Sequence, residues 1–480
     1  MTPQHTRRTW TPSGTWAVGG VLGAFALIAA AIAIPALTGW NVHVRSFPPL
    51  HAEWTPRVGL GLPAAVLLGA LVIWRGQRVA KQLTWRRLQI VVFVVALGWL
   101  LSLALVDGWN GIGTILNHRY EYLGTAREVT DFGATLNEYV ARIPFQHENN
   151  WPVHIAGHPP GALLFFYVLV RLGLGSGLAA GLVVTVLGAT IPVAVLGTVR
   201  LLGAEDFARK AAPLLVFSPA AIWIAVSGDG MFSAFAAWGA YALARSATAR
   251  SRQTKVGIRR PWVRMVVWAA VAGLLFGYCV MLSYGLLLLG VLAVTVLVVA
   301  RSWWPLPVAA VFGLGVVGVF AANGFAWWEA FPVVHQRYWD GIASRRPPEY
   351  WMWGNLAAFA MSAGPAIGAS LMGVVSGGIA TFRKRPRFAP LSATLQGEAG
   401  RKSAGTSMRV VLLLAAAGWM MIALADVSNM SRAEVERIWL PFAPWVLLGA
   451  TVFSERTLRW LLVVQVVFAI LLQSLLQTGW

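Results

Sequence analysis

The sequence has few of the features that define a soluble or disulfide-bonded protein. Its single cysteine, Cys279, lies inside an apolar run, which excludes a disulfide framework and a thiolate metal site. Only 12% of its 480 residues are charged, and the 18 Asp and Glu are outnumbered by 38 Lys and Arg. The sequence shows no internal repeat and no separate soluble domain. What remains is a chain dominated by apolar sequence.

Long apolar runs recur along the whole chain, which is 58% hydrophobic with a mean hydropathy of +0.65. Many runs have the ~18 to 25 residues that a helix needs to cross a bilayer, and they are continuous rather than alternating. The sequence therefore predicts an all-α polytopic membrane protein with about thirteen transmembrane helices. The first run is longer than the apolar part of a secretory signal, so we expect it to be retained. The expected spans are 15–38, 59–75, 88–106, 176–198, 207–227, 229–247, 264–282, 284–301, 306–325, 356–380, 410–426, 438–454 and 459–478.

The net charge of +20 is sorted along the chain in a way that indicates sidedness. By the positive-inside rule, the basic segments 75–87, 245–264 and 383–387 are expected in the cytoplasm. Fourteen of the eighteen carboxylates then lie outside or at the outer edge. The four that remain inside are Glu205, Asp206, Glu398 and Glu455. Charge sorted by membrane side argues against nucleic-acid binding and predicts a cytoplasmic-membrane protein whose polar chemistry faces outward.

The expected spans divide the chain into three parts. N-terminal helices occupy 1–87, a core occupies 88–301 with a large outer loop at 107–175, and C-terminal helices occupy 302–480. Two further outer loops are expected at 326–355 and 426–437. Segment 381–408 is rich in Pro, Gly, Ser and Arg, which predicts a flexible cytoplasmic linker.

The large outer loop contains a polar turn, HIAGHPP at 154–160, that leads directly into the apolar segment GALLFFYVLVR. Pro159 and Pro160 stop a preceding helix and favour the start of the next one. The apolar segment is short for a crossing, so we expect a juxtamembrane helix in the outer interface. Earlier in the loop, 121–129 has the pattern of a short amphipathic helix. The polar turn would therefore lie at the membrane surface, where it could meet a substrate with a polar head and a lipid tail.

Four short motifs follow one another along the chain: Glu121-Tyr122, His158-Pro159-Pro160-Gly161, Arg209-Lys210 and Asp229. Their order resembles that of the GT-C fold glycosyltransferases, which use polyprenyl-phosphate sugars. The resemblance covers about 107–247, with weaker support from EVERIWLPFAPW at 434–445. Many relatives carry an Asp about four residues before the tyrosine of the first loop. Here His118 and Arg119 stand at that place, so Glu121 is the nearest carboxylate, and Asp107 and Asp131 remain alternatives.

The resemblance implies transfer of a sugar from a polyprenyl-phosphate donor to a cell-envelope glycan, lipid or protein on the outer face. Such a reaction needs a carboxylate base and cationic groups for the departing phosphate. The expected catalytic residues are Glu121, Asp131 and Asp229. The expected substrate-binding residues are Tyr122, His154, His158, Arg337, Arg432 and Arg437. The two histidines, with a nearby acid, could also bind a divalent ion, so a metal cofactor stays open.

Composition narrows the expected donor to two kinds of polyprenyl-phosphate sugar and does not distinguish between them. Alanine richness and a preference for arginine over lysine are typical of a high-GC bacterium such as an actinobacterium. The resemblance would then point to decaprenyl-phosphate arabinose or polyprenyl-phosphate mannose. Two alternative functions remain at this stage: a flippase or transporter for a lipid or lipid-linked sugar, and a catalytically inactive scaffold of the same fold.

Overall fold

The computed structural model describes residues 12–249, 261–383 and 395–478, which are mostly helical. In this part of the chain, eight helical segments are long and apolar enough to cross a membrane. They are Gly14–Thr38, Leu62–Gln82, Trp85–Asp107, Gly177–Leu201, Trp262–Leu282, Pro305–Ala322, Gly405–Val427 and Glu455–Leu475. The expectation of a helical, multi-pass membrane protein is therefore compatible with the structure.

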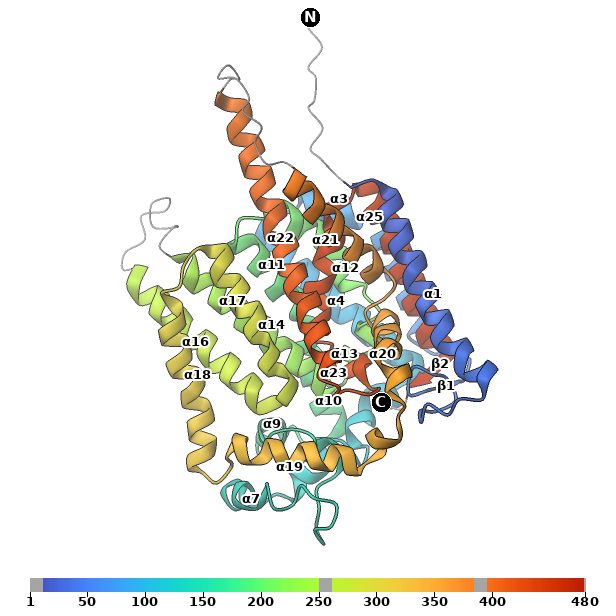
Figure 1. Cartoon of the computed structure of the whole chain (residues 1–480), viewed down its shortest axis with the longest axis vertical. Coiled ribbons are helices and arrows are strands. Elements are labelled where there is room, and N and C mark those ends of the chain that lie inside the picture. Colours follow the sequence, from blue (N-terminus) through green and yellow to red (C-terminus); the bar gives the residue numbers. More distant parts are fainter. Residues whose placement is uncertain (1–11, 250–260, 384–394, 479–480) are drawn as a thin grey trace, which may run out of the picture.

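The helices before residue 250 comprise the N-terminal spans, the large loop and the first part of the core (Figure 1). They are α1 (Gly14–Thr38), α2 (Leu62–Leu71), α3 (Gln77–Gln82), α4 (Trp85–Ala104), α5 (Asn110–Gly113), α6 (Tyr122–Glu128), α7 (Phe132–Glu138), α8 (Val153–Ala156), α9 (Gly161–Arg171), α10 (Gly177–Ala189), α11 (Ile191–Leu201), α12 (Glu205–Val216), α13 (Ala221–Ile224) and α14 (Gly228–Ala247). Short 3-10 turns occupy Leu105–Asp107 and Ile115–Asn117, and a π-helical turn at Val72–Gly76 joins α2 to α3.

The helices after residue 260 are α16 (Pro261–Leu282), α17 (Leu289–Ala300), α18 (Pro305–Ala322), α19 (Trp327–Asp340), α20 (Pro348–Ser362), α21 (Ala366–Arg383), α22 (Leu395–Val427), α23 (Val435–Ile438), α24 (Ala443–Leu447) and α25 (Glu455–Leu475). Three 3-10 turns lie at Tyr284–Leu288, Ile342–Arg345 and Leu448–Val452. The predicted linker 381–408 falls partly on 384–394, outside the described residues, and its second half belongs to α22.

The five other predicted spans are shorter, broken or more polar. Segment 207–227 is interrupted between α12 and α13, where Pro219 cannot continue the hydrogen-bond ladder. Segment 356–380 falls on the pair of helices α20 and α21, which meet at an angle of 107°. The turn between them contains Gly364, whose backbone is left-handed, followed by Pro365. Segment 438–454 is divided into α23, α24 and a 3-10 turn. Segment 284–301 begins as a 3-10 turn before α17, and α14 carries polar residues near both of its ends.

The large loop and α19 gather at one end of the molecule, across the bottom of Figure 1. Buried Arg337 of α19 ties the two together, because its guanidinium donates to the carbonyl oxygens of Ile143 and Trp151, the latter at 2.9 Å. At the opposite end, Arg209 of α12 donates to the carbonyls of Ala80 and Leu83, each at 2.8 Å. These contacts fix the two ends of the helix bundle.

Helices α1 and α21 cross at close range because each has a glycine at the contact. The backbone carbonyl of Gly368 occupies the place where a Cβ on Gly20 would stand, and the reverse is also true. Small residues of this kind let helix backbones approach in a membrane, where packing rather than water exclusion holds helices together.

A two-stranded antiparallel sheet joins the segment between α1 and α2 to the C-terminal end of the described chain. Strand β1 (Ala52–Trp54) pairs with β2 (Leu476–Thr478), with Ala52 opposite Thr478. The predicted span 459–478 is therefore too long: the helix ends at Leu475, and the next three residues extend to pair with β1. This pairing places Gln477 and Thr478 beside the large loop.

Candidate functional site

Helix α6 brings Glu121 into the interior. The predicted amphipathic helix at 121–129 is confirmed, and it buries Tyr122, Leu123 and Ala126. The Tyr122 ring stacks on Phe166 of α9, with centroids 5.5 Å apart and planes within 4°. Because Glu121 immediately precedes this buried turn, its side chain is drawn in and only 5% of it is exposed.

Asp229 stands in the first turn of α14. The helix is capped by Ser227, whose Oγ accepts from the backbone N–H of Gly230 at 2.9 Å. The residue before the cap, Val226, has a φ of +55°, a region that β-branched residues rarely adopt. Local strain of this kind is held in place by surrounding structure and often marks a functional site.

Arg437 lies on the short helix α23, and strain recurs just before it. Ala433 and Glu434 both have left-handed backbones, with φ of +71° and +63°. These two residues turn the chain so that the Arg437 side chain points into the protein, where it is 8% exposed. Both segments that supply charge to the site from the later part of the chain thus begin with strained backbone.

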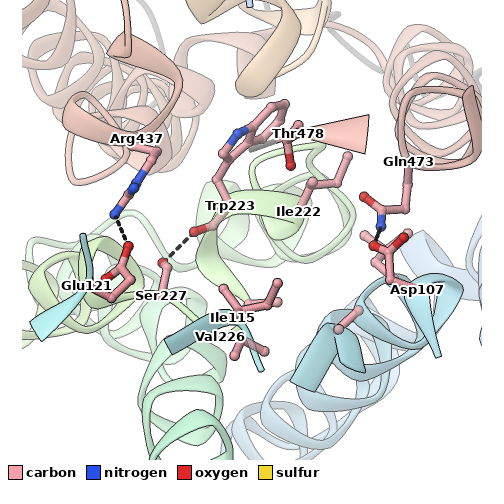
Figure 2. A pocket seen from close by; sticks show the side chains of 14 residues that line it. Asp107, Ile115, Glu121, Ile222, Trp223, Val226, Ser227, Arg437, Gln473 and Thr478 are labelled. Atoms are coloured by element: carbon pink, nitrogen blue, oxygen red, sulfur yellow. Dashed lines mark hydrogen bonds and ion pairs between the residues drawn. The ribbon is translucent and has the colours of Figure 1, made fainter. Parts of the chain in front are cut away.

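The three side chains form one buried ionic cluster, of which Figure 2 shows the contact between Arg437 and Glu121. Arg437 donates through Nε to Asp229 Oδ2 at 2.8 Å, and its Nη2 lies 2.6 Å from the same oxygen. Nη2 also donates to Glu121 Oε1 at 3.2 Å. On the other side, His154 Nδ1 lies 3.2 Å from Glu121 Oε1. One guanidinium therefore faces two carboxylates in a water-poor environment.

The ionisation of the cluster follows from these contacts. Burial pushes the pKa of Glu121 upward, but the Arg437 guanidinium and the His154 hydrogen bond outweigh it and hold that pKa at about 2. Burial acts to lower the pKa of Arg437, and the carboxylates of Asp229 and Glu121 raise it above its usual value. Glu121 is therefore an ionised carboxylate at neutral pH. Strongly perturbed groups of this kind are characteristic of functional sites.

Glu121 also stands where two cavities meet. Its second oxygen, Oε2, is buried and has no hydrogen-bond partner among the described residues. An inner cavity of about 40 Å³ runs past Glu121, Ser227 and Arg437, with room for a few water molecules at most (Figure 2). A wider, open cavity of about 470 Å³ lies next to it and is lined by Thr114, His118 and Gln477 among others. Glu121, Ile115 and Thr478 line both.

The HIAGHPP turn holds this arrangement in place. His154 belongs to the four-residue helix α8, and His158 Nδ1 donates to the His154 carbonyl oxygen at 2.7 Å. The Tyr139 hydroxyl donates to the carbonyls of Ile155 and His158, at 2.9 and 3.1 Å. Helix α9 then begins at Gly161, whose carbonyl accepts from the Tyr278 hydroxyl at 2.8 Å. The expected 161–171 helix is confirmed, and the turn seats it beside Glu121.

The donor set does not fit a divalent metal. Within the described residues there is no group of three or more His, Cys, Asp or Glu side chains that could hold one. Burial lowers the pKa of His158, which favours the neutral ring, and Nδ1 of that ring is already used by the backbone. Beside Glu121 and His154 stands the Arg437 guanidinium, whose charge would repel a dication.

The other predicted site residues lie outside the cluster. Asp131 caps α7, accepting from the backbone of Gly133 and Ala134 at 2.8 and 3.1 Å. Arg337 is committed to loop carbonyls, as described above. Arg432 donates to the carbonyls of Ala343 and Arg346 and stacks over Trp339. The alternative base Asp107 is paired with Arg57 and accepts from Gln473 at 2.9 Å. The structure thus brings together Glu121, Tyr122, His154, His158, Asp229 and Arg437.

Sequence reasoning missed two parts of this region. The first is the wall formed by β2, since an apolar helix gives no sign that its last residues will extend. The second is Glu436, next to Arg437, which is 1% exposed and has no side-chain hydrogen-bond donor among the described residues. Burial raises the pKa of this carboxyl to about 7. The sequence feature that could have pointed to Glu436 is its position within the charged segment SRAEVER.

Comparisons with known proteins add no assignment. No protein-family model matches the chain. Neither a curated protein nor a solved structure shows significant similarity to it. The chain is therefore placed by its own structure, whose long apolar helices fit a multi-pass membrane protein with a buried ionic cluster at one end.

Proposed function

We propose that the chain is a membrane glycosyltransferase of GT-C type. It would move a sugar from a polyprenyl-phosphate donor to a cell-envelope glycan, lipid or protein on the outer face of the cytoplasmic membrane. The thirteen crossings and the outward-facing loop predicted from the sequence belong to this proposal. They would place the end that carries Glu121, Asp229 and Arg437 outside.

The proposal rests on one observation: Glu121 is ionised, buried and only half engaged. Arg437 and His154 hold Oε1, whereas Oε2 has no hydrogen-bond partner in the described part of the chain, and the Glu121 residue lines both cavities. A carboxylate in that situation can accept a proton from a substrate hydroxyl. In the proposed reaction the acceptor oxygen attacks the anomeric carbon and its proton passes to Oε2. The bond from that carbon to the phosphate oxygen breaks, and polyprenyl phosphate leaves with the electron pair.

Arg437 suits the donor phosphate, because a guanidinium offers a planar fork of donors that matches phosphate oxygens. In this state both carboxylates occupy it, and the inner cavity is too small for a phosphate. Donor binding would therefore loosen the Glu121–Arg437 contact. Because that contact lowers the pKa of Glu121, loosening it would make Glu121 a stronger base when the donor is present. Asp229 would keep Arg437 in place.

The test is sugar transfer by the purified chain in lipid, with a panel of radiolabelled polyprenyl-phosphate sugars and a crude cell-wall acceptor. Wild type should transfer from at least one donor, and Glu121→Gln should lower the rate by about 10²- to 10⁴-fold. Glu128→Gln is the matched control, since Glu128 lies exposed at the end of the same helix and should leave the rate unchanged.

The other possible outcomes would support a different catalytic base or a different function. Transfer that survives in a folded Glu121→Gln would move the base to another carboxylate. Donor binding without transfer would favour a flippase for lipid-linked sugars. Absence of both donor binding and transfer would sink the glycosyltransferase proposal and favour a scaffold.

A further inference from the structure

The cavity of about 470 Å³ beside Glu121 is built from three distant segments. Arg45 comes from the loop after α1, Thr114 and His118 come from the start of the large loop, and Gln477 comes from strand β2. We propose that this cavity is the acceptor site and that it takes a neutral saccharide. The inference rests on the proposed function and assigns its second substrate.

The lining matches a sugar better than a phosphate. It presents hydroxyl groups, side-chain amides and an imidazole, which can exchange hydrogen bonds with the hydroxyls of a sugar. Arg45 is the one guanidinium among the described lining residues, and Glu53 lies 3.6 Å from it as an exposed ion pair. The rim is therefore close to neutral. The fork of donors that suits a phosphate stands instead at Arg437, in the inner cavity.

The size and openness of the two cavities point the same way. Small-molecule sites usually have volumes of about 300 to 1,000 Å³, and the wide cavity falls within that range. Thr114, His118 and Gln477 are exposed side chains, so a ligand can enter without moving the backbone. The inner cavity of about 40 Å³ cannot hold a sugar ring in this state.

The two cavities meet at the proposed base. Glu121 lines both, it is more than nine-tenths buried, and its Oε2 has no hydrogen-bond partner among the described residues. A hydroxyl presented from the wide cavity would approach Glu121 from one side, while a donor held by Arg437 would approach from the other. Holding two reactants on either side of a base in this way is the positioning that group transfer requires.

The C-terminal strand would then contribute to acceptor specificity. Gln477 lines the cavity and is placed there by the pairing of β2 with β1. Removing its amide by Gln477→Ala should raise the acceptor KM by about 3- to 10-fold, the effect of one neutral hydrogen bond. The kcat and the donor KM should stay the same. A fall in kcat with an unchanged acceptor KM would contradict a binding role.

A labelling experiment tests the site without using activity. Cys279, the only native cysteine, is buried, so Thr114→Cys would add a single exposed thiol at the cavity wall. The full chain in lipid would be reacted with a water-soluble maleimide, alone or with methyl glycosides and short oligosaccharides of arabinose, mannose, galactose and glucose. At least one saccharide should slow labelling threefold or more. Inorganic phosphate and a short prenyl phosphate should have no effect.

The control is Ser344→Cys, at an exposed position in the 3-10 turn before α20, where no saccharide should slow labelling. Protection of Thr114→Cys by prenyl phosphate would make the cavity the donor site and overturn the inference. Labelling unchanged by every saccharide would also overturn it. If transfer persists without protection, only the acceptor site is wrong. If protection occurs without transfer in wild type, the cavity binds saccharides but the proposed function fails.

Discussion

Arg437 holds two carboxylates that the chain supplies much earlier, Asp229 and Glu121, at separations of 208 and 316 residues. Taking three charges out of water is expensive, and their mutual attraction offsets this only when every partner is present. Removal of one partner leaves uncompensated charge in the interior. The stability of the site therefore depends more on the presence of all three charged groups than on the strength of any single ion pair.

Because the three charges must balance, removing all of them together should restore stability that is lost when one alone is removed. Arg437→Met should destabilise the folded chain by about 3 to 5 kcal/mol, because two buried carboxylates lose their counter-ion. The triple variant Arg437→Met, Glu121→Gln, Asp229→Asn removes all the charge and should recover most of that loss in a thermal unfolding assay. Sugar transfer should stay absent in both. A triple variant as unstable as the single one would show that packing, rather than charge, dominates there.

Glu436 gives a pH-dependent signal of its own. In the folded chain burial raises the pKa of its carboxyl from 4.5 to about 7. The folded state therefore keeps a proton that the unfolded chain loses, so stability falls as pH rises from about 4.5 to 7 and is level above that range. A shift of this size corresponds to about 3 kcal/mol at most.

The measurement compares unfolding of wild type and Glu436→Gln at pH 5 and pH 8. Wild type should be less stable than the variant at pH 8, with a smaller difference at pH 5. His51, whose pKa burial lowers to about 4, titrates in both proteins. The difference between the two therefore isolates Glu436, and a difference that does not vary with pH would contradict the assignment.

At the scale of elements, the crossing of α1 and α21 depends on the absence of two side chains. A methyl group at Gly20 would stand on the Gly368 carbonyl, and both partners are rigid helix backbone. Gly20→Ala should therefore force α1 away from α21 and destabilise the chain by about 1 to 3 kcal/mol.

The matched control is Gly23→Ala on the same helix, where a Cβ would meet nothing within 4 Å. That substitution should be neutral or slightly stabilising, since Ala favours helix over Gly. Thermal unfolding in lipid measures both. Equal effects of the two substitutions would mean that α1 is not held at this crossing.

The elements also show what sequence reasoning can and cannot reach. Two short helices of the large loop were predictable, because α6 follows from a local apolar pattern and α9 from the Pro pair before it. Glu121 was found because a motif with a tyrosine lay beside it. Its contact with Arg437 was not predictable from pattern, because no local rule links residues 316 positions apart. Pro219 and Pro365, which mark breaks in two of the predicted spans, are visible in the sequence. The long apolar runs around them nevertheless led to the prediction of continuous spans.

At the scale of the whole molecule, sidedness is the property that the proposed function most requires. The sequence predicts that the end carrying α7, α19 and the ionic cluster faces outward, and that the end carrying α3 and the start of α12 faces the cytoplasm. Buried Cys279 makes this testable with introduced thiols. Ser344→Cys should react with a membrane-impermeant maleimide in intact cells. Gln82→Cys, exposed at the end of α3, should react only after permeabilisation.

Reaction of both thiols in intact cells, or of Gln82→Cys alone, would reverse or abolish the predicted topology. The unsubstituted chain serves as the control, because Cys279 should not react in either condition.

The long separation between the acids and their guanidinium has a consequence for how the protein is made. A ribosome that has completed α14 has already delivered Glu121 and Asp229 to the membrane, but Arg437 is still about two hundred codons away. During that interval the two carboxylates have no counter-ion from Arg437, and burying them would be costly. The early helices must therefore stay apart, or keep water between them, until α23 emerges. Nascent chains halted before residue 437 should then need the insertion machinery to shield the two carboxylates from lipid. Quality-control proteases would encounter early helices that are still separated rather than packed together.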